Sequence, residues 1–141
     1  MTIGAILASK GNDVVSISSD DRVADAVAML AEKRIGAVPV IDNGHVVGIF
    51  SERDVVYSIA KVGAAALDAR IGDVMTAPAM TVDPDTAVMA GLSLMTKRRI
   101  RHLPVVRGDA VVGFISIGDL VKYRIDRVEA EAAAMRDYIA S

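Results

Sequence analysis

Cysteine and tryptophan are absent from this 141-residue sequence, and aromatic residues make up only 4% of it. Without cysteine the chain can form no disulfide framework, no zinc–thiolate site and no thiol nucleophile. With so few aromatic side chains, the core has to consist of Val, Ile, Leu, Met and Ala, which the 52% hydrophobic fraction supplies. The length suits one compact domain, or two very small domains that share a core.

The charge, the histidine count and the hydropathy pattern exclude further classes of protein. A net charge of −2 and an isoelectric point near 5.6 argue against a nucleic-acid partner, because such binders usually carry a basic surface. The two histidines, His45 and His102, lie far apart, so we expect no transition-metal site. No apolar run suits a signal peptide or a membrane span. We therefore expect a soluble cytoplasmic protein that does not contact a membrane.

The main feature that the sequence does contain is an internal repeat. A shift of 65 residues aligns residues 14–55 with residues 79–120 without a gap, and 11 of these 42 positions are identical. The period is too long for a solenoid, and only two copies exist. The repeat therefore indicates a duplicated supersecondary unit whose halves pack against each other.

Each copy predicts the element order β-α-β-β-α. A short extended segment precedes a helix whose apolar residues recur at helical spacing, so that one helix face is buried. Two strands follow around a turn, and Asn43-Gly44 is a dipeptide typical of hairpin turns. The strands are apolar almost throughout, which predicts sheets covered on both faces. The expected extended segments are 14–17 and 80–82, the first strands 37–41 and 102–106, and the second strands 46–50 and 111–115.

Residues 61–75 are expected to connect the two copies. A long final helix is expected from residue 119 to residue 139. Its apolar side chains are spaced alternately by four and three residues, which is the seam of a coiled coil. At 1.5 Å per residue the helix would be about 30 Å long, roughly the diameter of a small domain. It could cover its own domain, but we favour self-association into a homodimer. The seam consists of Val121, Ile125, Val128, Ala132, Met135 and Ile139.

The repeated motifs resemble those of the CBS (cystathionine-β-synthase-type) domain pair. The shared pattern is Ile-x-x-hydrophobic-Pro-Val, a turn, and then Gly-hydrophobic-hydrophobic-Ser-x-x-Asp, and the resemblance covers about residues 10–125. It implies a stand-alone Bateman-type module of mixed α/β class, in which tandem units pack with pseudo-two-fold symmetry. The implied divisions are a first repeat with connector (10–70), a second repeat (71–125) and a C-terminal helix extension (126–141).

The Ser-x-x-Asp motifs at residues 51–54 and 116–119 have two interpretations. Serine can cap a helix while the carboxylate three residues later reaches back to the backbone, which requires no function. The same helix N-terminus can also receive an anion. In the CBS family, which the motifs resemble, this serine and aspartate contact the ribose and phosphate of an adenosine derivative. The double occurrence favours the nucleotide-binding interpretation.

The resemblance implies two clefts between the repeats that are not equivalent. The first would be lined by Ser51, Arg53, Asp54, Ile100, Arg101 and His102, and the second by Ser116, Asp119, Ile35, Gly36 and Ala37. The basic side chains of the first cleft are suitable donors to phosphate oxygens, so a phosphorylated nucleotide should prefer it. The second cleft has only small neutral groups at the matching positions, unless Lys122 or Arg124 reaches in. We expect residues 75–80 to border the first cleft and Lys97 and Arg98 to be solvated, and we leave Arg99 open.

Catalysis is not expected from this set of residues. Ser51 lacks the Gly-x-Ser-x-Gly elbow of a serine hydrolase, and the chain contains no Gly-x-Gly-x-x-Gly or Walker pattern. We therefore expect a regulatory module without a catalytic cofactor that binds AMP, ADP, ATP or NAD and signals to an unidentified regulated protein. The alternative is a ligand-independent interaction module that acts through its C-terminal helix.

Overall fold

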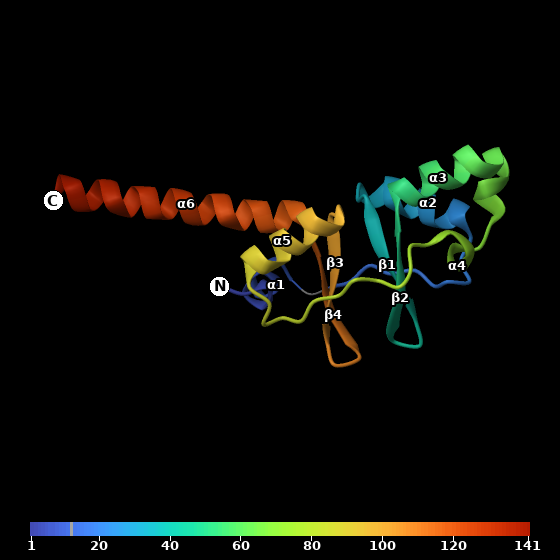
Figure 1. Cartoon of the computed structure of the whole chain (residues 1–141), viewed down its shortest axis with the longest axis horizontal. Helices are drawn as coiled ribbons and strands as arrows, with labels where there is room; N and C mark the ends of the chain where they lie inside the picture. The colour runs from blue at the N-terminus through green and yellow to red at the C-terminus, as the bar shows by residue number, and fades with distance from the viewer. Residues whose placement is uncertain (12) are drawn as a thin grey trace.

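The structure is a computed structural model that describes residues 1–11 and 13–141. It has mixed α/β architecture, as expected, with two pairs of strands separated and flanked by helices (Figure 1). The elements are α1 (Ile3–Lys10), α2 (Val23–Lys33), β1 (Ala37–Asp42), β2 (His45–Ser51), α3 (Glu52–Val62), the 3-10 helix η1 (Gly63–Asp68), α4 (Ile71–Val74), α5 (Val88–Arg98), β3 (His102–Arg107), β4 (Ala110–Ser116) and α6 (Ile117–Ala140).

The tandem duplication is confirmed by the elements themselves. Helix α5 repeats α2, and strands β3 and β4 repeat β1 and β2, each with bounds 65 residues further along the chain. Both hairpins are antiparallel, and the register of each shifts at the same place, after Val40 and after Val105. Arg34 and Arg99 end the matching helices α2 and α5 in the same left-handed conformation, each with φ of 54°.

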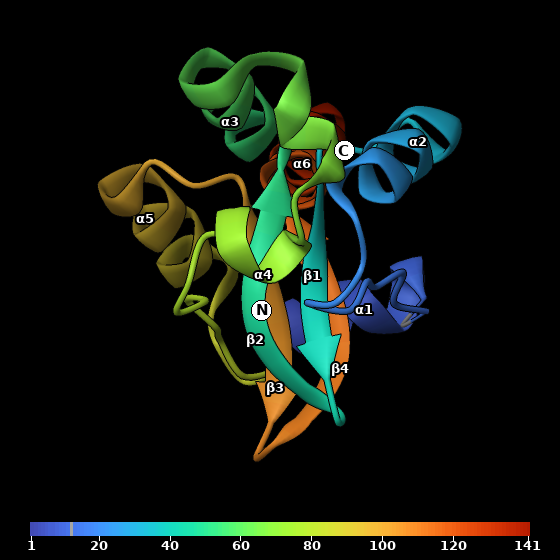
Figure 2. The same ribbon diagram turned by 90° about the vertical axis from the view of Figure 1, so that its right-hand side faces the viewer.

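The two hairpins form two separate two-stranded sheets that lie next to each other. Helices α2 and α3 lie at one end of the β1–β2 hairpin, and α5 and α6 lie at the same end of the β3–β4 hairpin (Figure 1). The view in Figure 2 looks along the stack, with the first hairpin in front of the second. Strands β2 and β4 are in contact, so the two repeats meet along these strands.

The extended segment expected before the first helix of each copy is shorter than predicted. Only Ile17, which pairs with Val40, and Val82, which pairs with Val105, form bridges, and both bridges are parallel. In the first copy the backbone N–H of Ser18 donates at 2.9 Å to the carboxylate of Asp21. This turn leads the chain away from the strand after one residue, so no ladder develops.

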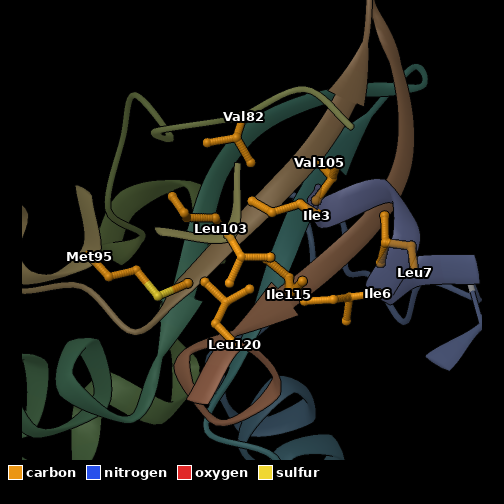
Figure 3. Close-up of a cluster of buried hydrophobic side chains, with 10 residues drawn as sticks. Ile3, Ile6, Leu7, Val82, Met95, Leu103, Val105, Ile115 and Leu120 are labelled. Atoms are coloured by element: carbon orange, nitrogen blue, oxygen red, sulfur yellow. The ribbon is translucent and has the colours of Figure 1, made fainter. Parts of the chain in front are cut away.

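Each repeat has its own apolar core. The second core includes Met95 of α5, Leu103 and Ile115 of the hairpin and Leu120 of α6, all of them buried (Figure 3). It also includes three residues of the N-terminal helix α1, which therefore packs against the second repeat rather than the first. The first core consists of Ile17, Val23, Ala26, Leu30, Val38, Val40, Phe50 and Ile71.

Helix α1 covers the second repeat in the way that α4 covers the first. The backbone N–H of Ile3 donates to the carbonyl of Thr86 at 2.9 Å, and that of Ile71 donates to the matching carbonyl of Asp21 at 2.8 Å. The next residue is glycine in both segments, and a Cβ atom on Gly4 would lie 3.0 Å from the carbonyl oxygen of Pro84. These two segments match at a shift of 68 residues, so the 65-residue alignment does not reveal them.

Helix α6 begins at Ile117 and continues to Ala140, slightly longer at both ends than the expected 119–139. Its first turns pack in the second core through Leu120, and the rest extends away from the body of the molecule (Figure 1). Within residues 1–11 and 13–141, no helix combines the length and apolarity that a membrane crossing requires.

Candidate functional site

A cavity of about 540 Å³ lies between the two repeats. Its volume falls in the range of roughly 300–1,000 Å³ that is usual for small-molecule sites. The first repeat, the linking segment and the second repeat all contribute walls, so a molecule bound here would touch both halves. The lining residues are Gly36, Ala37, Ile49, Ser51, Glu52, Arg53, Thr76, Pro78, Ala79, Met80, Arg98, Arg99, Ile100, Arg101 and His102.

The start of α3 forms one wall of this cavity. Ser51 is the N-cap residue, and the carboxylate of Asp54 accepts hydrogen bonds from its N–H at 2.9 Å and its hydroxyl at 3.2 Å. The other carboxylate oxygen of Asp54 accepts from Oγ1 of Thr76 at 2.8 Å. Asp54 is only 8% exposed and lies behind Ser51 and Thr76, which line the cavity. The motif therefore caps the helix, and Ser51 and Thr76, both bonded to Asp54, line the cavity wall.

The opposite wall carries the positive charge of the site. Arg98, Arg99 and Arg101 come from the end of α5 and the start of β3, and Arg53 faces them from the start of α3. Arg53 donates from Nη1 to the carbonyl oxygen of Arg99 at 3.3 Å and so links the two repeats. Arg98, expected to be solvated, is exposed but also lines the cavity, and Arg99, left open from the sequence, lines it as well. Guanidinium groups in this number suit an anionic ligand with several acceptor oxygens.

Glu52 is the one carboxylate among the residues that line this cavity. Its backbone N–H donates to the carbonyl of Gly36 at 3.0 Å. Its carboxylate lies 3.6 Å from where a Cβ atom on Gly36 would be. Sequence reasoning did not single out Glu52 or Thr76. Glu52 adjoins the predicted Ser51, and Thr76 lies inside the predicted bordering segment 75–80, so proximity in the chain was the available signal.

His102 is half-buried at the junction of the two predicted clefts. Its ring stacks on Phe114 with centroids 5.5 Å apart and an interplanar angle of 10°. Burial lowers the pKa of His102 below its usual value, and nearby Lys10 and Arg101 also lower it, while Asp119 and Glu52 oppose the shift. The neutral imidazole is therefore favoured, with one nitrogen able to donate and one to accept.

The second predicted cleft is arranged differently from the first. The hydroxyl of Ser116 accepts from the N–H of Asp119 at 3.1 Å, and the N–H of Ser116 donates to the Asp119 carboxylate at 2.8 Å. Nζ of Lys10, at the end of α1, donates to Asp119 Oδ2 at 2.6 Å and to the carbonyl of Phe114 at 3.1 Å. Burial raises the pKa of Asp119, but the hydrogen bonds from Lys10 and Ser116 outweigh it and hold the pKa below its usual value.

The structure thus brings together one of the two predicted residue sets. Five of the six residues of the first set line the cavity, and Asp54 supports it from behind. Of the second set, Gly36 and Ala37 line this same cavity. Ile35 packs against the first core, Asp119 accepts a hydrogen bond from Lys10, and Ser116 bonds Asp119 at the start of α6. The segment at 75–80 borders the first cleft as predicted, through Thr76, Pro78, Ala79 and Met80.

The part of the chain that the structure describes contains no cluster of metal-binding side chains. Among these residues, no three His, Asp or Glu side chains gather closely enough to hold a metal ion. What the cavity offers is hydroxyls, guanidinium groups and an apolar wall that includes Ile49, Met80 and Ile100. This combination can bind an organic anion that has a flat apolar part and a polar part.

Comparison with known proteins agrees with the duplicated fold. The family model for the CBS domain matches residues 4–61 and 71–126. The CBS domain-containing protein CBSX3, mitochondrial, of Arabidopsis thaliana is 33% identical over 147 residues, which cover 98% of this chain and 71% of that protein. The structure of the CBS-domain containing protein ATU1752 from Agrobacterium tumefaciens aligns with a TM-score of 0.84 and 38% identity, covering 87% of this chain and 92% of the other.

A third similar protein was solved with ligands. The CBS domain pair of protein MJ0100, in complex with 5′-methylthioadenosine and S-adenosyl-L-methionine, aligns with a TM-score of 0.79. The two chains are 23% identical, and the alignment covers 90% of this chain and 98% of that one. At this identity the likeness establishes the common fold.

Proposed function

This chain belongs to the CBS domain family, and we propose that it is a regulatory module that binds an adenine nucleotide in the cavity between its repeats. The observation that carries the proposal is the cavity itself, which places the N-terminus of α3 and Ser51 opposite three arginines of the second repeat. A helix N-terminus and guanidinium groups are both favourable partners for phosphate. AMP, ADP, ATP and NAD all carry phosphate next to adenosine.

The nucleoside part of such a ligand has matching partners in the same cavity. The apolar residues Ile49, Met80 and Ile100 can border the adenine ring, and Ser51 and Thr76 can bond ribose hydroxyls. An ionised carboxylate has about four acceptor positions, and Asp54 accepts three hydrogen bonds. We therefore keep Asp54 as a ribose-binding residue, with its remaining acceptor position directed to a ribose hydroxyl. The complex of MJ0100 with two adenosine-containing ligands supports this choice of ligand class.

The proposed regulation follows from the position of the ligand between the repeats. A nucleotide that touches both halves stabilises the relative orientation in which all its contacts are made. It can shift the population only by the difference between its affinities for the two orientations. The role is binding and signalling to a regulated protein, without catalysis. The cytoplasmic location stays a prediction, and the Arabidopsis relative is named as mitochondrial.

We also propose that the module is a homodimer formed through α6. Beyond its first turns this helix is exposed, and its seam side chains stay accessible, with Ile125 51% and Met135 59% exposed. In proteins, a helix gains most of its stability from packing its apolar face against another element. A second copy of α6 supplies the same heptad seam, so two copies can cover each other.

The exposed α6 also supports the alternative of a ligand-independent interaction module. In that case the cavity would have no physiological ligand, and α6 would bind a different protein. The discriminating residues are Arg101 and His102, because in a purely structural module Arg101→Ala and His102→Ala would cause no loss of ligand binding.

Thermal-shift and calorimetric measurements with AMP, ADP, ATP, NAD and S-adenosylmethionine test the proposal. We expect one of the phosphorylated ligands to stabilise the wild type, and Asp54→Ala and Arg101→Ala to abolish that stabilisation. The control is Arg107→Ala, at the far end of β3 and outside the cavity lining. A wild type that responds to none of these ligands would favour the interaction module.

A further inference from the structure

We infer that Lys10 of the N-terminal helix closes the second cleft by occupying the carboxylate of Asp119, so that the module binds one nucleotide per chain. The inference rests on the proposed function, because it concerns the second of two related clefts. It assigns to α1, which lies outside the 65-residue repeat, the role of making the two clefts different.

Because the two repeats are related by pseudo-symmetry, the two clefts can be compared at one pair of matching residues. Asp54 and Asp119 occupy the same position in the two Ser-x-x-Asp motifs, and both accept a hydrogen bond from the segment that covers their repeat. For Asp54 the donor is the neutral hydroxyl of Thr76, at 2.8 Å. For Asp119 the donor is the ammonium of Lys10, at 2.6 Å.

These two donors have different consequences for a ligand. The hydroxyl of Thr76 leaves the negative charge of Asp54 in place and has an oxygen that can itself accept a bond from a ribose hydroxyl. The ammonium of Lys10 neutralises the charge of Asp119, occupies its Oδ2 together with the N–H of Ser116, and has no acceptor of its own, so this carboxylate is a weaker partner for a ribose hydroxyl than that of Asp54.

The chain also follows different paths past the two clefts. After the covering segment α4 ends at Val74, the chain runs extended along the open cavity through Pro78, Ala79 and Met80. Helix α1 instead continues to Lys10, and the side chain of Lys10 reaches both the carboxylate and the carbonyl oxygen of Phe114. Ser116 and Asp119 line neither the cavity between the repeats nor the smaller one beside Gly4, Leu7 and Arg107.

The side chain of Lys10 can be replaced without disturbing a core. It is 43% exposed, and that of Asp119 is 25% exposed. The buried residues of α1 are Ile3, Ile6 and Leu7, which lie before Lys10 in the helix. Lys10→Ala therefore removes the ammonium while it retains the residues that attach α1 to the second repeat.

Calorimetric titration with AMP tests the inference through the number of sites. We expect the wild type and the control Lys61→Ala, an exposed change on α3, to bind one AMP per chain. Lys10→Ala should bind a second AMP with an affinity for the second cleft roughly tenfold or more above that of the wild type, because a charge-assisted hydrogen bond no longer competes. The double variant Lys10→Ala/Asp119→Asn should return to one site. Thermal scans without ligand verify that each variant is folded.

Each result separates this inference from the proposed function. Two sites of similar affinity in the wild type, or one unchanged site in Lys10→Ala, overturn the inference while the proposed function stands. A wild type that binds none of AMP, ADP, ATP and NAD overturns the proposed function. The closing of the second cleft by Lys10 is then still supported if Lys10→Ala gains a site that Asp119→Asn removes, and it is overturned if no site is gained.

Discussion

Arg53 and Arg99 belong to different repeats, and Nη1 of Arg53 donates to the carbonyl oxygen of Arg99 at 3.3 Å across the cavity. Both residues also line that cavity. The hydrogen bond is long for an N–H to carbonyl contact, whose usual distance is about 2.9–3.0 Å. A phosphate group placed in the cavity can therefore compete for Arg53, which couples ligand binding to the contact between the repeats.

The first prediction concerns Arg53 itself. Arg53→Ala removes one guanidinium from the proposed phosphate site, and hydrogen bonds to charged groups contribute about 1.5–3 kcal/mol. We expect the Kd for AMP to rise roughly tenfold or more, with little change in the unfolding temperature, because Arg53 is exposed. Calorimetry on Arg53→Ala and on the control Arg107→Ala measures the effect, and an unchanged Kd would remove Arg53 from the site.

The second prediction uses the charge of Glu52 to distinguish ligand classes. Glu52→Gln removes the carboxylate from a cavity that also holds several guanidinium groups. Exposed charge pairs contribute about 0.2–1 kcal/mol, so AMP and ATP should bind up to about fivefold more tightly. S-adenosylmethionine, whose sulfonium is positive, should bind less tightly. Competition titrations of the two ligand types give the sign for each, and a change in the same direction for both would show that the ligand charge does not face Glu52.

The third prediction concerns stability as a function of pH. Burial lowers the pKa of His102 below its usual value of 6.5, with contributions from Lys10 and Arg101 that are opposed by Asp119 and Glu52. Between the folded pKa and 6.5 the unfolded chain binds more protons, so stability should fall as the pH falls from about 7.5 through this window. The pKa values of Asp42 and Asp119 are lowered from 3.8, so their stabilisation is lost only at pH values below about 4.

Thermal unfolding of the wild type and of His102→Gln between pH 7.5 and pH 5.5 measures this effect. Glutamine does not titrate, so the variant should lose less of its unfolding temperature over that range than the wild type. Parallel curves for the two proteins would contradict the proposed burial of the imidazole.

The fourth prediction concerns the seam of α6. Val128→Glu places a charge on the proposed dimer contact, where Val128 is 45% exposed in the single chain. We expect the variant to be monomeric at micromolar concentration and the wild type to be dimeric, as measured by light scattering. The control Ala130→Glu lies on the opposite side of the helix, two residues away, and should stay dimeric. A monomeric wild type would contradict the proposed dimer.

Much of the fold could be predicted from the sequence because the same motifs occur in both repeats. The Pro-Val pairs and the Val-Val-Gly segments fix both hairpins, and the serines at residues 51 and 116 mark the starts of α3 and α6. The same motifs place Ser51 opposite Arg101 and His102, which the structure brings into one cavity. Local sequence patterns are enough to predict a contact when both residues of the contact belong to the repeated motifs.

The remaining features depend on contacts that the 65-residue alignment does not contain. Helix α1 packs against the second repeat, more than 80 residues away in the chain, through Ile3 and its carbonyl partner Thr86. The matching Ile-Gly pairs at residues 3–4 and 71–72 carry the signal, but at a shift of 68. As a result, Lys10 cannot be placed on Asp119 from the sequence, which attributes the difference between the clefts to Arg53, Arg101 and His102.

The central claim is that an adenine nucleotide binds in the cavity between the repeats, and NMR of the ¹⁵N-labelled protein during a titration with AMP as the probe tests it most directly. We predict that the amide signals that move most belong to Ser51, Thr76 and Ile100–His102, while those of Ser116 and Gly118 stay in place. Saturable shifts confined to the first group would establish the site. An AMP titration that leaves Ser51 and Arg101 unmoved would contradict the claim.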